Sequence, residues 1–178
     1  MSVPVIGLSG SPNTTSRSRA LLELALAALD RQGAGPSRLI DLAKLAPDAL
    51  LGRRQDPDVA EAIQSVLNAG ILVVSTPIYR ATYSGLLKVF FDLLPQDALA
   101  GKVAIPIATG GGPSHLLAVD HGLRPLLASV GALVVATGIY GTDAQFRAGV
   151  PEPALVERVE RAVLEATPAA TSAKGVTT

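Results

Sequence analysis

The chain has 178 residues, a length that suits one domain with a stable core, and 48% of these residues are apolar although only 3% are aromatic. Its fifteen basic and fifteen acidic side chains cancel, which excludes the strongly positive surface of a nucleic-acid-binding protein. Because the chain has no cysteine, disulfides, thiolate nucleophiles and cysteine-ligated metal or iron–sulfur sites are excluded as well.

The chain begins with MSVPVIGLSG, which lacks the basic start and the long apolar run of a signal peptide or membrane span, so we expect a cytoplasmic protein that does not contact a membrane. Apolar runs rich in β-branched residues then alternate with longer helical patterns. The expected strands are residues 3–8, 38–42, 71–75, 103–108 and 132–138. The expected helices are residues 17–31, 57–68, 84–94, 114–130 and 153–166. Residues 1–166 should form one domain, and the small, polar residues 167–178 are expected to be a disordered tail.

Most of the expected strands show no alternation of apolar and polar residues, which is typical of parallel strands buried on both faces. Strand followed by helix, repeated along the chain, predicts right-handed βαβ units. We therefore expect an α/β, flavodoxin-like three-layer sandwich: a five-stranded parallel sheet of order 2-1-3-4-5 with helices on both faces. In that order ligands bind beyond the carboxyl ends of the first and third strands, so function should lie in the loops after strands one, three and four.

The loop after the first strand, SGSPNTTSRS, holds more hydroxyls and amides than a turn requires. Arg17 and Ser18 open the next helix, whose N-terminal N–H groups and positive dipole end favour an anion. A phosphate monoester fits this set, because hydroxyls and N–H groups donate and a guanidinium adds charge. The alternative is that Ser16 caps the helix and the other polar side chains are solvated. A Rossmann site and a P-loop are not expected, because GxGxxG and GxxxxGK[ST] are absent.

The loop after the third strand, TPIYRATYSGLLK, contains two of the three tyrosines, Tyr79 and Tyr83. In a chain so poor in aromatic residues, this pair indicates contact either with a planar ring or with another subunit. Ser84 is expected to cap the following helix. Arg80 either meets a second phosphate or lies in solvent.

The loop after the fourth strand begins with three glycines, whose exposed N–H groups suit the polar edge of a ligand such as the pyrimidine ring of a flavin. The two histidines of the chain, His115 and His121, follow on the expected helix. Their spacing places them on roughly opposite faces of a regular helix, so we expect no metal site. For His115 a structural role and a catalytic role both remain open.

Together the three loops, GSPNTTSRS, TPIYRATYSGLLK and IATGGGPSHLLAVDHGLRP, resemble those of the NAD(P)H-dependent FMN reductases. The likeness is greatest to the flavin reductases of two-component alkanesulfonate and methanesulfonate monooxygenases, and it covers residues 3–165. It implies that NADPH or NADH reduces FMN by hydride transfer, and that reduced FMN leaves for a flavin-dependent monooxygenase. It also implies a homo-oligomer, either a dimer or a tetramer.

The resemblance also implies which residues bind the cofactor. Those at the phosphate would be Ser11, Ser16, Arg17 and Ser18, preceded by Ser9. Those that line the flavin ring would be Pro77, Ile78, Tyr79 and Ser84. Those at its polar edge would be Thr109, Gly110, Gly111 and Gly112. His121 best matches the position at which this branch inserts a residue into the fourth helix, forming a π-bulge near the tetramer interface.

No catalytic residue is assigned, because hydride transfer between two cofactor rings needs positioning and electrostatics rather than a general base. Two other functions fit the same fold. A quinone or azo-compound reductase would keep FMN bound and reduce a second substrate. A flavodoxin-type electron carrier would need a docking face, typically acidic, which this neutral chain does not suggest.

Overall fold

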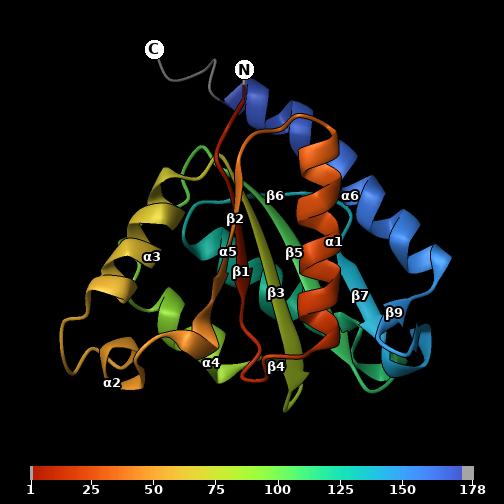
Figure 1. Cartoon of the computed structure of the whole chain (residues 1–178), viewed down its shortest axis with the longest axis horizontal. Coiled ribbons are helices and arrows are strands. Elements are labelled where there is room, and N and C mark those ends of the chain that lie inside the picture. Colours follow the sequence, from red (N-terminus) through yellow and green to blue (C-terminus); the bar gives the residue numbers. More distant parts are fainter. Residues whose placement is uncertain (1, 174–178) are drawn as a thin grey trace.

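A central sheet lies between two layers of helices in the computed structural model, which describes residues 2–173 (Figure 1). The strands are β1 (Val5–Ser9), β2 (Ser37–Asp41), β3 (Ile71–Tyr79), β4 (Thr82–Tyr83), β5 (Val103–Gly110), β6 (Leu133–Val134), β7 (Ile139–Thr142), β8 (Phe146–Arg147) and β9 (Val150–Pro151). The α-helices are α1 (Arg17–Arg31), α2 (Pro47–Leu50), α3 (Pro57–Asn68), α4 (Gly85–Phe91), α5 (Arg124–Ser129) and α6 (Pro153–Ala173). Shorter helices are η1 (Leu42–Lys44), η2 (Pro113–His115), the π-helix η3 (Val119–Leu123) and η4 (Asp143–Gln145).

The sheet runs in the order β2-β1-β3-β5-β6, with β7 also beside β5 and β4 beside β3. All of these pairings are parallel except that of β4 with β3. The winding reverses at β1, because β2 lies on one side of it and β3 on the other. The carboxyl ends of β1 and β3 therefore flank the crevice at which ligands bind in open α/β sheets.

The prediction of five strands is wrong, because the sheet has seven. The last predicted strand, 132–138, contains only the two-residue β6, and β7 begins after its predicted end. The residues between β6 and β7 have main-chain groups that bond to side chains. The Arg124 guanidinium donates to the carbonyls of Val135 and Ala136, and Glu165 accepts from the N–H and hydroxyl of Thr137. The other additional strand, β4, forms where the chain turns back after β3.

Alternate residues along each core strand are buried on opposite faces of the sheet. Val5 and Ile71 pack in the layer of α1 and α6, whereas Ile6 and Leu72 pack in the layer of α3 and α4. Figure 1 shows α1 and α6 on one side of the sheet and α3 on the other. Burial on both faces explains why the strands are apolar throughout.

The last helix extends past residue 166, the predicted end of the domain, because α6 continues to Ala173. Ala169 and Ala170 extend the apolar face of this helix onto the same core as α1, and Ala170 is only 3% exposed. This packing favours the helix although Pro168 lies within it. The remaining residues of the predicted tail lie outside the described part of the chain. Among residues 2–173, no helix has the length and apolar character needed to cross a membrane.

Candidate functional site

A cavity of about 270 Å³ lies at the carboxyl ends of the parallel strands, and we call it the carboxyl-edge pocket. All three loops singled out in the sequence contribute to its wall. The described residues that line it are Ser11, Asn13, Thr15, Ser16, Arg17, Pro77, Ile78, Tyr79, Thr109, Gly110, Gly111 and Asp143.

The loop after β1 supplies hydrogen-bond donors at the N-terminus of α1. Ser16 is the N-cap, and its hydroxyl accepts from the N–H of Arg19 at 3.2 Å. Ser16 therefore both caps the helix and lines the pocket, so the two interpretations of this loop are compatible. The Ser18 hydroxyl lies 3.2 Å from that of Ser16, but Ser18 is fully buried and does not line the pocket. The hydroxyls of Ser11 and Thr15, the first-turn N–H groups and Arg17 form a donor set that fits a phosphate.

Two buried hydroxyls at the same edge have no hydrogen-bond partner among the described residues. Ser9 ends β1 and is 1% exposed, and Ser75 faces it in the register of β3 and is 0% exposed. Buried hydroxyls are normally bonded, because an unpaired one costs about 1–3 kcal/mol. Ser9 lies at the carboxyl end of β1 and Ser75 lies beside it, but neither residue lines the carboxyl-edge pocket.

The end of β3 and the short strand β4 form a hairpin with a two-residue turn. Arg80 and Ala81 occupy that turn with positive φ angles of 50° and 70°, as a type I′ turn requires. This conformation is unfavourable for residues other than glycine, and such strain is concentrated at functional sites. Tyr79 is 45% exposed at the pocket wall, whereas Tyr83 packs against the core beside α4. The two tyrosines therefore do not share one role.

Ser84 caps α4 and does not line the pocket. Its hydroxyl accepts from the N–H of Leu87 and donates to the carbonyl of Gly10, and the residue is 1% exposed. Its N–H donates to the Thr76 hydroxyl at 2.9 Å. A side chain on Gly10 would put its Cβ 2.9 Å from the Cβ of Leu87. Ser84 thus joins the first loop to the end of β3. It supports the pocket wall through these bonds although it does not line the pocket.

The glycine loop after β5 is held by a tyrosine that the sequence analysis did not single out. Tyr140 of β7 is 7% exposed, and its hydroxyl donates to the carbonyl of Gly112 at 2.6 Å. Gly110 and Gly111 line the pocket but Gly112 does not. A Cβ on Gly110 would lie 2.5 Å from the Tyr140 hydroxyl. Burial, and then the charge of Asp143, raise the pKa of Tyr140, which keeps its proton on the hydroxyl.

The predicted helix 114–130 is broken into η2, the π-helix η3 and α5. His121 is the middle residue of η3, and Gly122 lies so close to β4 that a Cβ there would meet the Thr82 hydroxyl at 2.7 Å. Both histidines line a second cavity of about 260 Å³ between η3 and the β3–β4 turn. The expectation that they occupy opposite faces is wrong, because the segment is not a regular helix. Within the described residues, no cluster of three or more acidic or histidine side chains is placed to bind a metal.

The chain is similar to known proteins over most of its length. The model of the NADPH-dependent FMN reductase family matches residues 3–146. An FMN reductase (NADPH) of Pseudomonas putida is 40% identical over 158 residues, which cover 88% of this chain and 80% of that protein. The chain belongs to the NADPH-dependent FMN reductase family.

Solved structures place this FMN reductase among flavodoxin-like proteins. The apo form of the NADH:FMN oxidoreductase EMOB matches with a TM-score of 0.87 and 40% identity, over 96% of this chain and 90% of that one. A flavodoxin of Streptococcus pneumonia matches at 16% identity with a TM-score of 0.63, over 93% of this chain and 97% of that one. The second likeness shows the fold alone, which is a flavodoxin-like α/β fold.

Asp143, the acidic residue of the carboxyl-edge pocket, was not predicted from the sequence. The Nη1 atom of Arg17 donates to its Oδ1 atom at 2.7 Å. The last strand was predicted to end at residue 138, but β7 begins at Ile139 and runs to Thr142, and its carboxyl end reaches the same edge as those of β3 and β5. With the correct strand end, the rule that loops after strands carry function would have included this residue.

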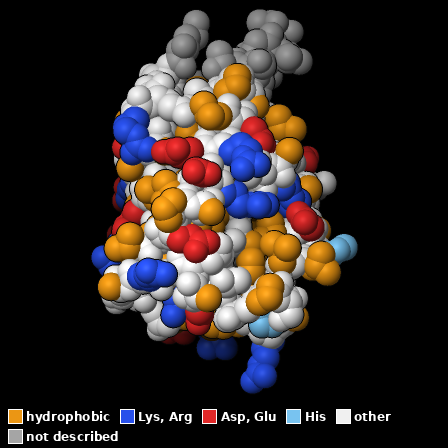
Figure 2. Space-filling model, turned by 90° about the vertical axis from the view of Figure 1, so that its right-hand side faces the viewer, with side chains coloured by type: hydrophobic (Ala, Val, Ile, Leu, Met, Phe, Trp, Pro, Cys, Tyr) orange, Lys and Arg blue, Asp and Glu red, His pale blue; other side chains and the backbone are white. Residues whose placement is uncertain are grey.

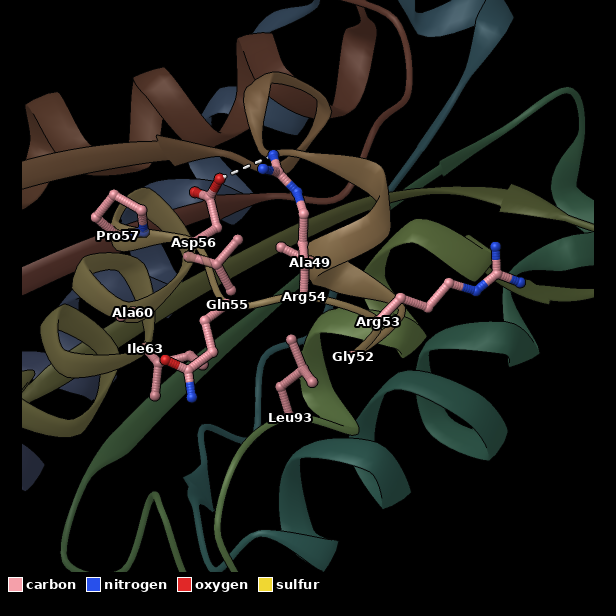
Figure 3. Close-up of a pocket in the computed structure, with 11 residues that line it drawn as sticks. Ala49, Gly52, Arg53, Arg54, Gln55, Asp56, Pro57, Ala60, Ile63 and Leu93 are labelled. Carbon is pink, nitrogen blue, oxygen red and sulfur yellow. Dashed lines mark hydrogen bonds and ion pairs between the residues drawn. The ribbon is translucent and has the colours of Figure 1, made fainter.

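A larger cavity, of about 760 Å³, lies elsewhere, between the loop after α2, the start of α3 and Leu93. Figure 3 shows Arg54 turned back towards Asp56, with which it forms an ion pair at 3.1 Å, and Arg53 pointing away from these residues. The charged groups of this cavity therefore do not converge on one point, whereas those of a ligand site do. None of the predicted cofactor-binding residues lines it.

Proposed function

We propose that this FMN reductase binds FMN in the carboxyl-edge pocket, with the phosphate at the N-terminus of α1, and reduces it with NADPH or NADH. The observation that carries the proposal is the meeting of two donor sets in one cavity. The hydroxyl- and guanidinium-bearing loop after β1 and the glycine loop after β5 line the same 270 Å³. A phosphate and the polar edge of a flavin require these two sets of donors at opposite ends of one molecule.

The residues present fit FMN. Ser11, Ser16 and Arg17 would bind the phosphate, Pro77, Ile78 and Tyr79 would contact the ring, and Thr109, Gly110 and Gly111 would face its polar edge. Bound FMN supplies the redox chemistry, because it accepts a hydride from the nicotinamide.

The protein's own contribution is positioning. The Ser84 hydroxyl fixes the Gly10 turn, and the Tyr140 hydroxyl fixes the glycine loop, so that the two ends of the pocket keep their spacing. The strained turn at Arg80 holds Tyr79 at the wall between them. No side chain is needed as a general base in such a site.

The proposal extends to release of reduced FMN to a flavin-dependent monooxygenase, in the cytoplasm, where reduced nicotinamides are made. Motif similarity to the sulfonate-system reductases supports this partner. We also propose a homo-oligomer, a dimer or tetramer. Leu116 and Leu117 support it, because they are 47% and 61% exposed beside the histidine-lined cavity. Figure 2 shows apolar side chains gathered near the histidines.

The test compares FMN with riboflavin, which lacks the phosphate, as substrates for NADPH and NADH oxidation. We expect turnover with FMN, and a KM for FMN about tenfold higher in Arg17→Gln, with the KM for riboflavin unchanged. Arg31→Gln, at the other end of α1, is the matched control and should leave both values unchanged. Absence of turnover with every flavin would refute the activity. An unchanged KM for FMN in Arg17→Gln would refute the phosphate assignment alone.

A further inference from the structure

Asp143 is the one carboxylate among the described residues that line the carboxyl-edge pocket, and it is paired with the one cation there, Arg17. The pair connects the loop after β1 to the loop after β7, across 126 positions of sequence. Asp143 begins η4, where Thr142 and Gln145 form a capping box that fixes the turn. The position of the carboxylate is therefore set by the fold and not only by its attraction to Arg17.

The pair makes the formal charge of the pocket lining zero. Every other described lining side chain is neutral at pH 7, so Asp143 cancels the charge of Arg17. A phosphate monoester carries a charge of about −1.5 to −2 at that pH. Its attraction to the pocket therefore comes mainly from hydroxyls and N–H groups, and it must share the guanidinium with a like-charged carboxylate.

Asp143 has two opposite effects on a phosphate at Arg17. It holds the guanidinium at the pocket, which favours binding, and it competes for the guanidinium and repels the phosphate, which opposes binding. The side chains of Arg17 and Asp143 are 47% and 48% exposed, and such exposed ion pairs hold a side chain only weakly. Solvent also screens the repulsion between the two anions, but the carboxylate and the phosphate would bond to the same guanidinium. Competition for that donor group adds to the repulsion, so the opposing effect is the larger one.

We propose that Asp143 lowers the affinity of the pocket for the phosphate of FMN by competing for Arg17, and thereby favours release of the flavin. The inference rests on the proposed function, because it requires the FMN phosphate to bind beside Arg17. The side chain to which Asp143 bonds is that of Arg17, at the phosphate end, so we expect riboflavin, which lacks the phosphate, to bind independently of Asp143. The residue thus sets how strongly the protein prefers FMN to riboflavin and how long FMN stays.

The test is Asp143→Asn, with dissociation constants of FMN and riboflavin measured by quenching of flavin fluorescence in the absence of NAD(P)H. We expect FMN to bind about fivefold more tightly and to dissociate more slowly by a similar factor, with riboflavin unchanged. Asp143→Glu keeps the charge and should bind FMN as the parent does. Asp92→Asn removes the same charge from the end of α4, where Asp92 pairs with Lys88, and is the matched control for net charge.

Three results would overturn the inference. FMN affinity that is unchanged or weaker in Asp143→Asn would show that holding Arg17 in place is the larger effect. Equal tightening of FMN and riboflavin would show that Asp143 does not act on the phosphate. Tightening in Asp92→Asn as well would show an effect of net charge. Arg17→Gln distinguishes a failure of the proposed function. If the FMN phosphate does not bind beside Arg17, this variant binds FMN and riboflavin with the same affinities as the parent.

Discussion

The hydroxyl of Tyr140 donates a hydrogen bond to the carbonyl oxygen of Gly112, with 2.6 Å between the two oxygen atoms. This bond joins β7 to the glycine loop after β5, which supplies one end of the carboxyl-edge pocket. Because the carbonyl of Gly112 is held by Tyr140, the N–H groups of the glycine loop keep a fixed orientation. In the proposed site, Tyr140 is thus a positioning residue for the polar edge of the flavin.

Tyr140→Phe removes this bond and preserves the shape of the buried ring. We expect FMN and riboflavin to bind about fivefold more weakly, by the same factor, because both flavins have the polar edge that the loop faces. Titration of flavin fluorescence measures both constants. Tyr83→Phe, at a partly buried tyrosine that packs against the core beside α4, is the control. A loss confined to FMN would contradict this role and assign Tyr140 to the phosphate end.

Gly110→Ala places a Cβ 2.5 Å from the Tyr140 hydroxyl, so the tyrosine or the loop must shift. We expect a loss of about 1–3 kcal/mol in the free energy of unfolding, measured by urea denaturation. Gly111→Ala is the matched control, because its Cβ meets nothing within 4 Å. The double variant Gly110→Ala/Tyr140→Phe lacks the clashing oxygen and should recover part of the loss. If Gly111→Ala were as unstable as Gly110→Ala, close packing would not be the cause.

The sequence predicts the core of this fold well, because its signals there are local. The predicted helices 17–31 and 57–68 coincide with α1 and α3, each of which begins at a capping side chain, Ser16 and Asp56. The pocket was predicted for a similar reason, since the loop after β1 and the glycine loop contain unusual residues at positions where parallel strands end.

What the sequence did not predict depends on contacts between distant residues. Between β6 and β7, the main chain bonds to the side chains of Arg124 and Glu165. Both residues are distant in sequence, so no local pattern predicts this interruption of the strand. In the sequence, Asp143 has no pattern that indicates a binding site. Its contact with Arg17 depends on the position of β7 in the sheet. Ser84 has the signature of a helix cap, and only the fold shows that its hydroxyl also bonds to Gly10.

Ser84→Ala removes a buried hydroxyl that has two bonds, and leaves the Gly10 carbonyl and the Leu87 N–H without this partner. We expect a loss of about 2 kcal/mol in the free energy of unfolding. Ser129→Ala, which removes a single bond to the Leu126 carbonyl at the end of α5, should cost clearly less. Urea denaturation of both variants makes the comparison. Equal losses would show that the two bonds of the Ser84 hydroxyl contribute no more than the single bond of the Ser129 hydroxyl.

Glu165 should make stability depend on pH in the acid range. Burial alone would raise its pKa, but hydrogen bonds from the Thr137 hydroxyl and from the N–H groups of Thr137 and Ala136, together with the charge of Arg124, lower it below the usual 4.5. A lowered pKa in the folded state means that the ionised form stabilises the protein above pH 4.5, and that this contribution is lost as the pH falls below that value.

Glu165→Gln keeps an acceptor for Thr137 and removes the titration. Urea midpoints measured from pH 7 to pH 3.5 should show the parent more stable at neutral pH, with the difference shrinking as the pH falls through the acid range, about pH 4.5 to 3.5. Glu157→Gln, on the exposed side of the same helix, is the control. If the difference in urea midpoint between the parent and Glu165→Gln stays constant with pH, the charge of the carboxylate does not stabilise the segment between β6 and β7.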